Sequence, residues 1–313
     1  SSLIVLAVFV AGLFFAARTA SGENIWAEVT RISWLQLFAL LALSAVNYLF
    51  RATRWYLYSS ALHIALSPMQ VIRHFIGGFA LTMTPARVGE LVRIRWINKE
   101  SGTPYEVATP LVLVDRAADL ASMGLLLAAS VALMTGGIQG AIPVAALAIL
   151  TAIVVTRPAL FRRAIRTAWQ LIGKKPRVFV RLGRGADALM PFSDAKLALP
   201  AMALGFFGWF AEGFAFYLLM DWMGSPLPLW TCIGIFVFSM ITGGLTGMPG
   251  GLGGAEAAMV ALLSIQGVPL ETAIPATAII RVTTLWFAVA LGLLVFPIAE
   301  AKATKAGHAL ERN

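Results

Sequence analysis

Residues 271–297 read ETAIPATAIIRVTTLWFAVALGLLVFP, and this stretch decides the fold class. It exceeds the roughly 20 apolar residues that a helix needs to cross a bilayer, and after Glu271 its only charge is Arg281. The whole chain has the same character, with 59% hydrophobic and 12% charged residues. Soluble domains carry about 25% charged residues. We therefore predict an all-α polytopic membrane protein.

Other apolar stretches predict how often the chain enters the membrane. Full-length spans are expected at residues 1–17, 34–57, 107–134, 138–157, 197–221 and 271–297. No basic segment precedes the first of these, so we interpret it as a membrane helix rather than a signal peptide. Two further stretches, 70–84 and 229–248, end in Pro/Gly-rich motifs, and broken backbone is tolerated at membrane depth only in a protein-lined environment. The prediction is about six transmembrane helices plus two re-entrant hairpins.

The distribution of basic residues predicts the orientation. The chain has 24 Lys and Arg against 15 Asp and Glu, and ten basic residues lie in the polar segment 157–196. Because Lys and Arg are enriched in cytoplasmic loops, we expect that loop, the segment from Arg51 to Glu106 and the C-terminus to be cytoplasmic. The expected location is the cytoplasmic (inner) membrane of a prokaryote. The net charge of +9 fits anionic lipid, and we expect no nucleic-acid partner.

Residues that hold metals and cofactors are scarce in this sequence. Cys232 is the single cysteine and lies in an apolar stretch. The three histidines, His63, His74 and His308, have no second ligand at metal spacing. We therefore expect no metal and no cofactor.

The sequence matches itself at an offset of 165 residues. Between 102–116 and 267–281, six of fifteen positions are identical, ending in Arg116 and Arg281. Chance and helix-start chemistry are the alternative explanation. Under the predicted topology the two copies run in opposite directions, so we expect an inverted repeat, which is a transporter plan. The expected division of the single membrane domain 1–313 is repeat 1 at 34–134, a connecting helix and loop at 138–196, repeat 2 at 197–297 and a tail at 298–313.

Two broken-helix motifs are candidate parts of a binding site. The first, 84–95, reads TPARVGELVRIR, in which Arg87, Arg93 and a free helix N-terminus suit an anion such as phosphate, with Glu90 holding the arginines. The second, 246–256, reads TGMPGGLGGAE and brings an isolated Glu256 into apolar surroundings. An ordinary interfacial helix and small-residue helix packing remain open as alternatives. The expected hinge residues are Thr84, Pro85, Gly89, Pro249, Gly250, Gly251 and Gly253.

A third group of charges lies inside predicted spans. Asp115, Arg116 and Asp119 have helical spacing and are expected to form a local network, functional or purely structural. Arg281 has no acid within a helical turn, so its partner is Glu256, a ligand phosphate or Glu212. Glu212 is kept as a weaker member of the site. The predicted substrate-binding residues are Arg87, Glu90, Arg93, Asp115, Arg116, Asp119, Glu256 and Arg281.

These motifs, in their order and spacing, resemble the flippase-like membrane domain of lysylphosphatidylglycerol synthases from about residue 40 to 297. The resemblance implies a cavity lined by these charged and glycine residues that lipid headgroups reach from both leaflets. Ala86 stands where many relatives have glycine. The printed chain ends about 16 residues after the last expected span, so lysyl transfer is not expected of it.

The leading hypothesis is a lipid translocase rather than an enzyme. Its substrate would be an anionic phospholipid, a glycolipid or a polyprenyl-phosphate lipid. One alternative is a membrane-embedded glycosyl- or phospho-transferase that uses Asp115 and Asp119 as base or metal ligands. Another is a scaffold that binds a separate lipid-modifying enzyme through the loop 157–196.

Overall fold

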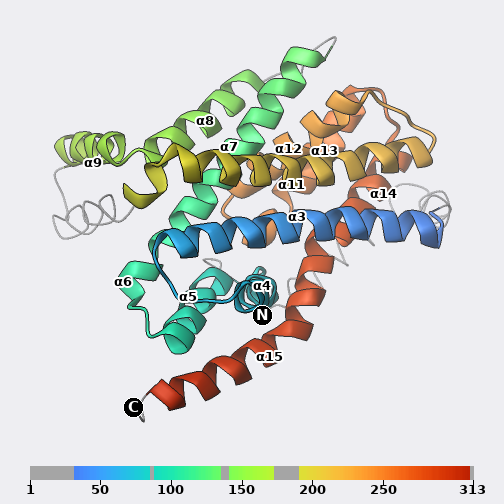
Figure 1. Ribbon diagram of the computed structural model, residues 1–313. Coiled ribbons are helices and arrows are strands. Elements are labelled where there is room, and N and C mark those ends of the chain that lie inside the picture. The colour runs from blue at the N-terminus through green and yellow to red at the C-terminus, as the bar shows by residue number, and fades with distance from the viewer. Residues whose placement is uncertain (1–31, 85–87, 135–140, 173–189, 311–313) are drawn as a thin grey trace.

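The computed structural model is helical throughout the residues it describes, which are 32–84, 88–134, 141–172 and 190–310 (Figure 1). The predicted span 1–17, the hinge residue Pro85, the site residue Arg87 and the middle of the basic loop lie outside these residues.

The first half of the chain starts with a long helix and continues in short ones. Helix α3 (Trp34–Ala61) begins at Ser33, whose hydroxyl and Gln36 form a capping box. A 10-residue helix, α4 (Pro68–Gly77), leads into the 3-10 turn η1 (Gly78–Leu81). Three helices follow: α5 (Val88–Ser101), the single turn α6 (Tyr105–Ala108) and α7 (Pro110–Leu133). At about 1.5 Å per residue, α4 is too short to cross a bilayer, as expected of a re-entrant arm.

Two helices connect the halves, and the second half then repeats the order of long and short elements. The connecting helices are α8 (Ala141–Thr156) and α9 (Pro158–Ile172), and the short turn η3 (Met190–Ser193) precedes α11 (Ala195–Trp222). Helix α11 has 28 residues, as α3 has. The chain continues through α12 (Leu229–Leu245), η4 (Pro249–Gly251), α13 (Gly254–Ile265), α14 (Leu270–Arg281), the π-helical η5 (Val282–Trp286) and α15 (Phe287–Leu310).

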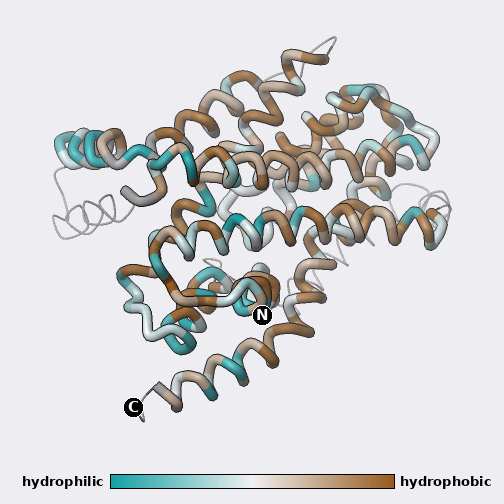
Figure 2. The backbone as a smooth tube through the Cα atoms, viewed as in Figure 1, coloured by the Kyte–Doolittle hydropathy of each residue, from teal (hydrophilic) through white to brown (hydrophobic). Residues whose placement is uncertain are grey.

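Three helical stretches among the described residues are long and apolar enough to cross a membrane: Trp34–Ala61, Ala195–Trp222 and Leu270–Gly307. They match three of the predicted spans. Helix α7 also lies where a span was predicted, but it carries three charged residues in its first half. Helix α8 covers residues 141–156 of the span predicted at 138–157, whose first three residues lie outside the described ones. Figure 2 shows the apolar character of most helices and the more hydrophilic α9 and end of α15.

The apolar side chains form two main cores. One unites α11, α12 and α13 with part of α7, around residues such as Phe216, Phe236 and Leu126. The other joins α3 and α4 to α5 and the start of α7, around Trp55, Phe75 and Leu111. Helices α3 and α11 pack side by side and connect the two cores (Figure 1).

Glycines let the broken elements touch in both halves. A Cβ on Gly89 of α5 would stand 2.2 Å from the carbonyl oxygen of Gly78, so the two backbones are in direct contact. In the second half, a Cβ on Gly243 of α12 would stand 2.7 Å from the Cβ of Ala255. Gly250 has φ of +63°, a left-handed conformation that glycine adopts without strain. In the second motif, Gly250, Gly251 and Gly254 have close neighbours, whereas a Cβ on Gly247 or Gly253 would meet nothing within 4 Å, so close packing accounts for only some of its glycines.

Candidate functional site

A cavity of about 390 Å³ lies between the two halves of the molecule. Its walls come from α3, η1, α5 and α7 on one side and from α11, α12, η4 and the α14–η5 junction on the other. Nine of the predicted site, hinge and weaker residues line it: Gly89, Glu90, Arg93, Arg116, Asp119, Glu212, Gly250, Gly251 and Arg281.

The remaining described residues of the prediction do not line the cavity. Asp115 and Glu256 lie behind its wall, each bound to an arginine, as shown below. Thr84 accepts a hydrogen bond from the Val88 amide at 3.2 Å, so it caps α5. Pro249 starts η4, and Gly253, with φ of +79°, immediately precedes α13.

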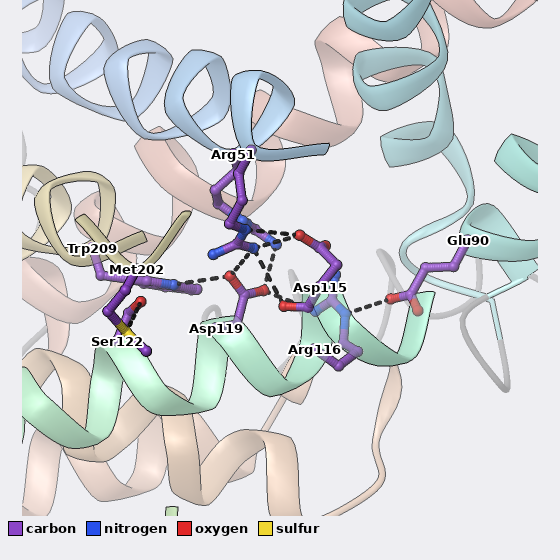
Figure 3. A network of polar contacts seen from close by, with 9 residues as sticks. Arg51, Glu90, Asp115, Arg116, Asp119, Ser122, Met202 and Trp209 are labelled. Atoms are coloured by element: carbon purple, nitrogen blue, oxygen red, sulfur yellow. Dashed lines mark hydrogen bonds and ion pairs between the residues drawn. The ribbon is translucent and has the colours of Figure 1, made fainter. Parts of the chain in front are cut away.

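Four charges from α3 and α7 form a network at one wall (Figure 3). Arg54 is fully buried and donates to Asp115 Oδ1 from Nε at 3.0 Å and to Asp119 Oδ1 from Nη2 at 2.7 Å. Arg51 donates to Asp119 Oδ2 at 2.8 Å, and the indole of Trp209 donates to Asp119 Oδ1 at 3.2 Å. Each aspartate thus has an arginine partner, which is what a carboxylate in an apolar bundle requires.

Arg51 and Arg54 were missed as site residues, since they were counted only among the basic residues of the segment from Arg51 to Glu106. They lie inside α3, at 8% and 0% exposure, and face α7 rather than water. They occur near the end of an apolar stretch, where arginine commonly marks an interface. Their partners are more than 60 positions away, so only the presence of two unneutralised aspartates in a predicted span hinted at them.

Arg116 makes the predicted contacts with its neighbours and one that was not expected. Its guanidinium lies 3.4 Å from Asp119 Oδ2 and 3.7 Å from Asp115 Oδ2. Its nearest carboxylate is that of Glu90, 3.1 Å from Nε. Glu90 was expected to hold Arg87 and Arg93, but it pairs with Arg116 on α7, while Arg87 is not among the described residues. Glu90 therefore joins α5 to α7.

Arg281 is held by three groups of the second half. Its Nε donates to Glu256 Oε1 at 2.6 Å, its Nη2 to the Gly250 carbonyl at 2.7 Å and its Nη1 to Met240 Sδ at 3.5 Å. Glu256, one of three predicted partners, is therefore the actual one. The π-helical turn η5 follows at once, and Tyr48 of α3 donates to the Thr284 carbonyl there, a bond that joins the two halves.

Arg93 differs from the other cavity arginines because, among the described residues, it forms no close ion pair with an acid, and only the more distant charges of Glu90 and Asp115 act on it. It is 3% exposed, and its Nε and Nη1 have no hydrogen-bond partner. Its guanidinium carbon lies 4.1 Å from the centre of the Phe75 ring and 5.4 Å from that of Phe79. Cation–π contacts of this kind hold a guanidinium without neutralising its charge.

Glu212 is the acidic residue of the cavity that, like Arg93, forms no ion pair among the described residues. It lies on α11, lines the cavity and is 4% exposed. In the described part of the chain, no arginine or lysine forms an ion pair with its carboxylate. The cavity therefore contains one arginine and one carboxyl group that form no ion pair with each other or with other described residues. The other charged residues around it form ion pairs.

Asp115 and Asp119 serve mainly as partners of arginines. Asp119 accepts hydrogen bonds through both carboxylate oxygens and Asp115 through Oδ1, whereas Asp115 Oδ2 is buried without a hydrogen-bond partner. Within the described ranges, no group of three or more His, Cys, Asp or Glu could hold a metal ion.

Long apolar helices around a cavity lined by arginines and carboxylates define a polytopic membrane protein with an internal polar site. Comparison with known families is specific: residues 2–292 match the family described as the transmembrane region of lysylphosphatidylglycerol synthase. The chain belongs to this family.

A curated relative has been recognised over part of the chain. It is a UPF0104 membrane protein of Methanothermobacter thermautotrophicus (strain Delta H), 24% identical over 108 residues. The match covers 34% of this chain and 32% of that protein. Its name says only that it is a membrane protein, so it adds a prokaryotic relative and no activity.

Proposed function

We propose that this protein is a lipid translocase of the flippase or scramblase type, which moves an anionic polar lipid between leaflets. The headgroup would pass through the cavity while the acyl or isoprenoid chains stay in the surrounding lipid. The proposed substrates are an anionic phospholipid, a glycolipid with an anionic headgroup or a polyprenyl-phosphate lipid.

One observation carries this proposal, namely the free guanidinium of Arg93 in the cavity wall. An arginine at membrane depth costs roughly 2.5–3.5 kcal/mol on insertion scales unless it is paired or faces water. Arg93 has two unused hydrogen-bond donors, Nε and Nη1, and forms no close ion pair among the described residues, although the charges of Glu90 and Asp115 act on it. A planar fork of N–H donors suits the oxygens of a phosphate, so an anionic headgroup satisfies what the protein leaves unsatisfied.

The two similar halves support movement as well as binding. Glu90 pairs with Arg116 in the first half, and Glu256 pairs with Arg281 in the second, at offsets of 166 and 165 positions. We propose that the halves are an inverted repeat with two re-entrant arms, in which each charge pair can open the cavity to one leaflet.

Orientation and partners are proposed from the sequence. The loop 157–196 and the C-terminal tail would face the cytoplasm of a prokaryotic cell, because they carry thirteen of the basic residues. A separate lipid-modifying enzyme that supplies the substrate on that side is a proposed partner.

The test is translocation of fluorescent lipids in proteoliposomes of the purified protein. The probes are labelled phosphatidylglycerol, a labelled polyprenyl phosphate and a labelled neutral glycolipid, each quenched from outside to report its leaflet. The wild type is expected to move the anionic probes, and Arg93→Gln to slow them at least tenfold. Arg95→Gln is the matched control, since Arg95 lies on the same helix but pairs with Glu300 away from the cavity.

Folding is checked by comparing thermal unfolding and reconstitution of both variants with the wild type. Movement of no probe by a correctly reconstituted wild type would exclude the translocase. Equal slowing by Arg93→Gln and Arg95→Gln would mean that general charge, rather than the cavity, governs the rate.

A further inference from the structure

When the arginines around the cavity are paired with carboxylates, one acidic residue remains without an arginine partner. Four of the arginines are each matched by a carboxylate: Arg51 with Asp119, Arg54 with Asp115, Arg116 with Glu90 and Arg281 with Glu256. Among the described cavity residues this leaves Arg93, with a fixed positive charge, and Glu212, whose charge depends on a proton.

The surroundings of Glu212 show that its carboxyl group has no fixed counter-ion. From α3, Asn47, Tyr48 and Arg51 are near it; Asp119 faces it from α7 and Arg281 from the end of α14. Both arginines already bond to other acids, Asp119 and Glu256. Helix α12 adds apolar and thioether groups to this wall and no charged side chain. The proton on Glu212 is therefore the variable charge of this cavity.

Binding of an anion at Arg93 favours the protonated form of Glu212. With Glu212 ionised, the empty cavity is neutral, and a singly charged headgroup would make it negative. With Glu212 protonated, the loaded cavity is neutral. Since charge is costly in a low-dielectric region, the anion and the proton favour each other's binding, and this coupling is reciprocal.

We propose that Glu212 takes up one proton when an anionic headgroup binds Arg93, so that lipid and proton cross together and the transport is electroneutral. The proton comes from water on the side of loading and returns to water on the side of release, and no covalent bond other than the O–H bond changes. This inference rests on the proposed translocase function and adds its coupling ion.

The test uses proteoliposomes with labelled phosphatidylglycerol, with the membrane potential held at zero by valinomycin and equal potassium. An acidic outside is expected to drive the wild type to accumulate label in the inner leaflet, by up to about tenfold per pH unit for one proton per lipid. Internal pyranine should report acidification that requires the anionic lipid. Asp221→Asn, at the exposed end of the same helix, is the matched control and should behave as wild type.

Glu212→Gln separates coupling from movement. The variant is expected to equilibrate the label but not to accumulate it against the gradient. Because it moves the anion without a proton, an imposed membrane potential should now drive the label, whereas the wild type should ignore the potential. Glu212→Asp keeps a titratable group and should keep coupling, which covers the case in which the glutamine variant does not fold.

The outcomes distinguish the two proposals. No movement of any probe by wild type overturns the translocase itself. Movement without accumulation, or equal responses of wild type and Glu212→Gln to the potential, overturns proton coupling alone. Preference for an amine-bearing zwitterionic probe that ignores the pH gradient would assign Glu212 to the amine and would also overturn it.

Discussion

The two halves, residues 34–133 and 195–310, both line the cavity but differ in the charges they place there. Tyr48 and Trp209 line it at an offset of 161, Leu120 and Leu285 at 165. The pair of Glu90 and Arg116 recurs as Glu256 and Arg281. The polar framework of the cavity therefore has a counterpart in each half.

The differences lie at the same cavity wall. Under the proposed repeat, Arg51 corresponds to Glu212 at offset 161 and Asp119 to Thr284 at offset 165, and all four line the cavity. Arg51 and Asp119 bind each other, but glutamate and threonine cannot form an ion pair, so Glu212 stays unpaired. Arg93 corresponds to the buried Met259 at offset 166. The first half thus supplies the unpaired arginine of the cavity, and the second half supplies the unpaired carboxyl group.

Arg54→Ala should have the strongest effect on stability, since it removes a buried charge that only the first half has. It leaves the buried Asp115 without its partner and is expected to lower the free energy of unfolding by about 3–5 kcal/mol. Unfolding in mixed detergent micelles measures this. Position 215 in the second half is Ala, and position 280 is Ile. The double variant Arg54→Ala with Asp115→Ile, which places these two residues in the first half, should recover more than half of the lost unfolding free energy. No recovery would contradict the ion-pair explanation.

Gly250→Ala is expected to cost about 1–3 kcal/mol, because φ of +63° strains any residue with a Cβ and the added atom would approach Met83 at 2.9 Å. The close contact of the first half, at Gly89, involves packing without this backbone strain. Gly244→Ala is the control, since a Cβ there meets nothing within 4 Å. Asn tolerates the left-handed region, so Gly250→Asn should cost less strain than Gly250→Ala. Equal unfolding energies for Gly250→Ala and Gly244→Ala would show that the turn is not strained.

The lengths of the apolar stretches predicted much of the fold. They did not predict which charged residues form ion pairs. The spans predicted at 34–57 and 197–221 became helices 34–61 and 195–222, because a helix that crosses a bilayer needs at least about 20 mostly apolar residues. Arg54 and Asp115 meet across 61 positions, and no local pattern encodes such a contact. Arg93 and Glu212 could be recognised as free only after every neighbouring charge had been assigned a partner. The free residues are thus a property of the packed structure.

Double-mutant cycles measure the coupling energies of the two Glu–Arg pairs. The side chains of Arg281 and Glu256 are 4% and 16% exposed, whereas those of Arg116 and Glu90 are 30% and 15% exposed. Less water screens the second pair, so its coupling energy should exceed that of the first by about 1 kcal/mol. The cycles combine Arg→Met with Glu→Gln in each half and compare free energies of unfolding. Equal couplings would mean that burial does not distinguish the halves.

Glu100 marks a smaller difference, since Gln266 stands at the corresponding position at offset 166. Burial raises the pKa of Glu100, but the bond from His74 and the charges of His74 and Arg73 outweigh it and hold the pKa below the ordinary 4.5. A lowered pKa stabilises the fold above that ordinary value, and the contribution is lost as pH falls through the folded pKa. Glu100→Gln should therefore cost about 1 kcal/mol near neutral pH, and the difference from wild type should shrink below pH 4.5. Thermal unfolding from pH 7 downward measures it, with Glu106→Gln, on the exposed turn α6, as the control. A difference that stays constant with pH would mean that Glu100 acts through packing and not through its charge.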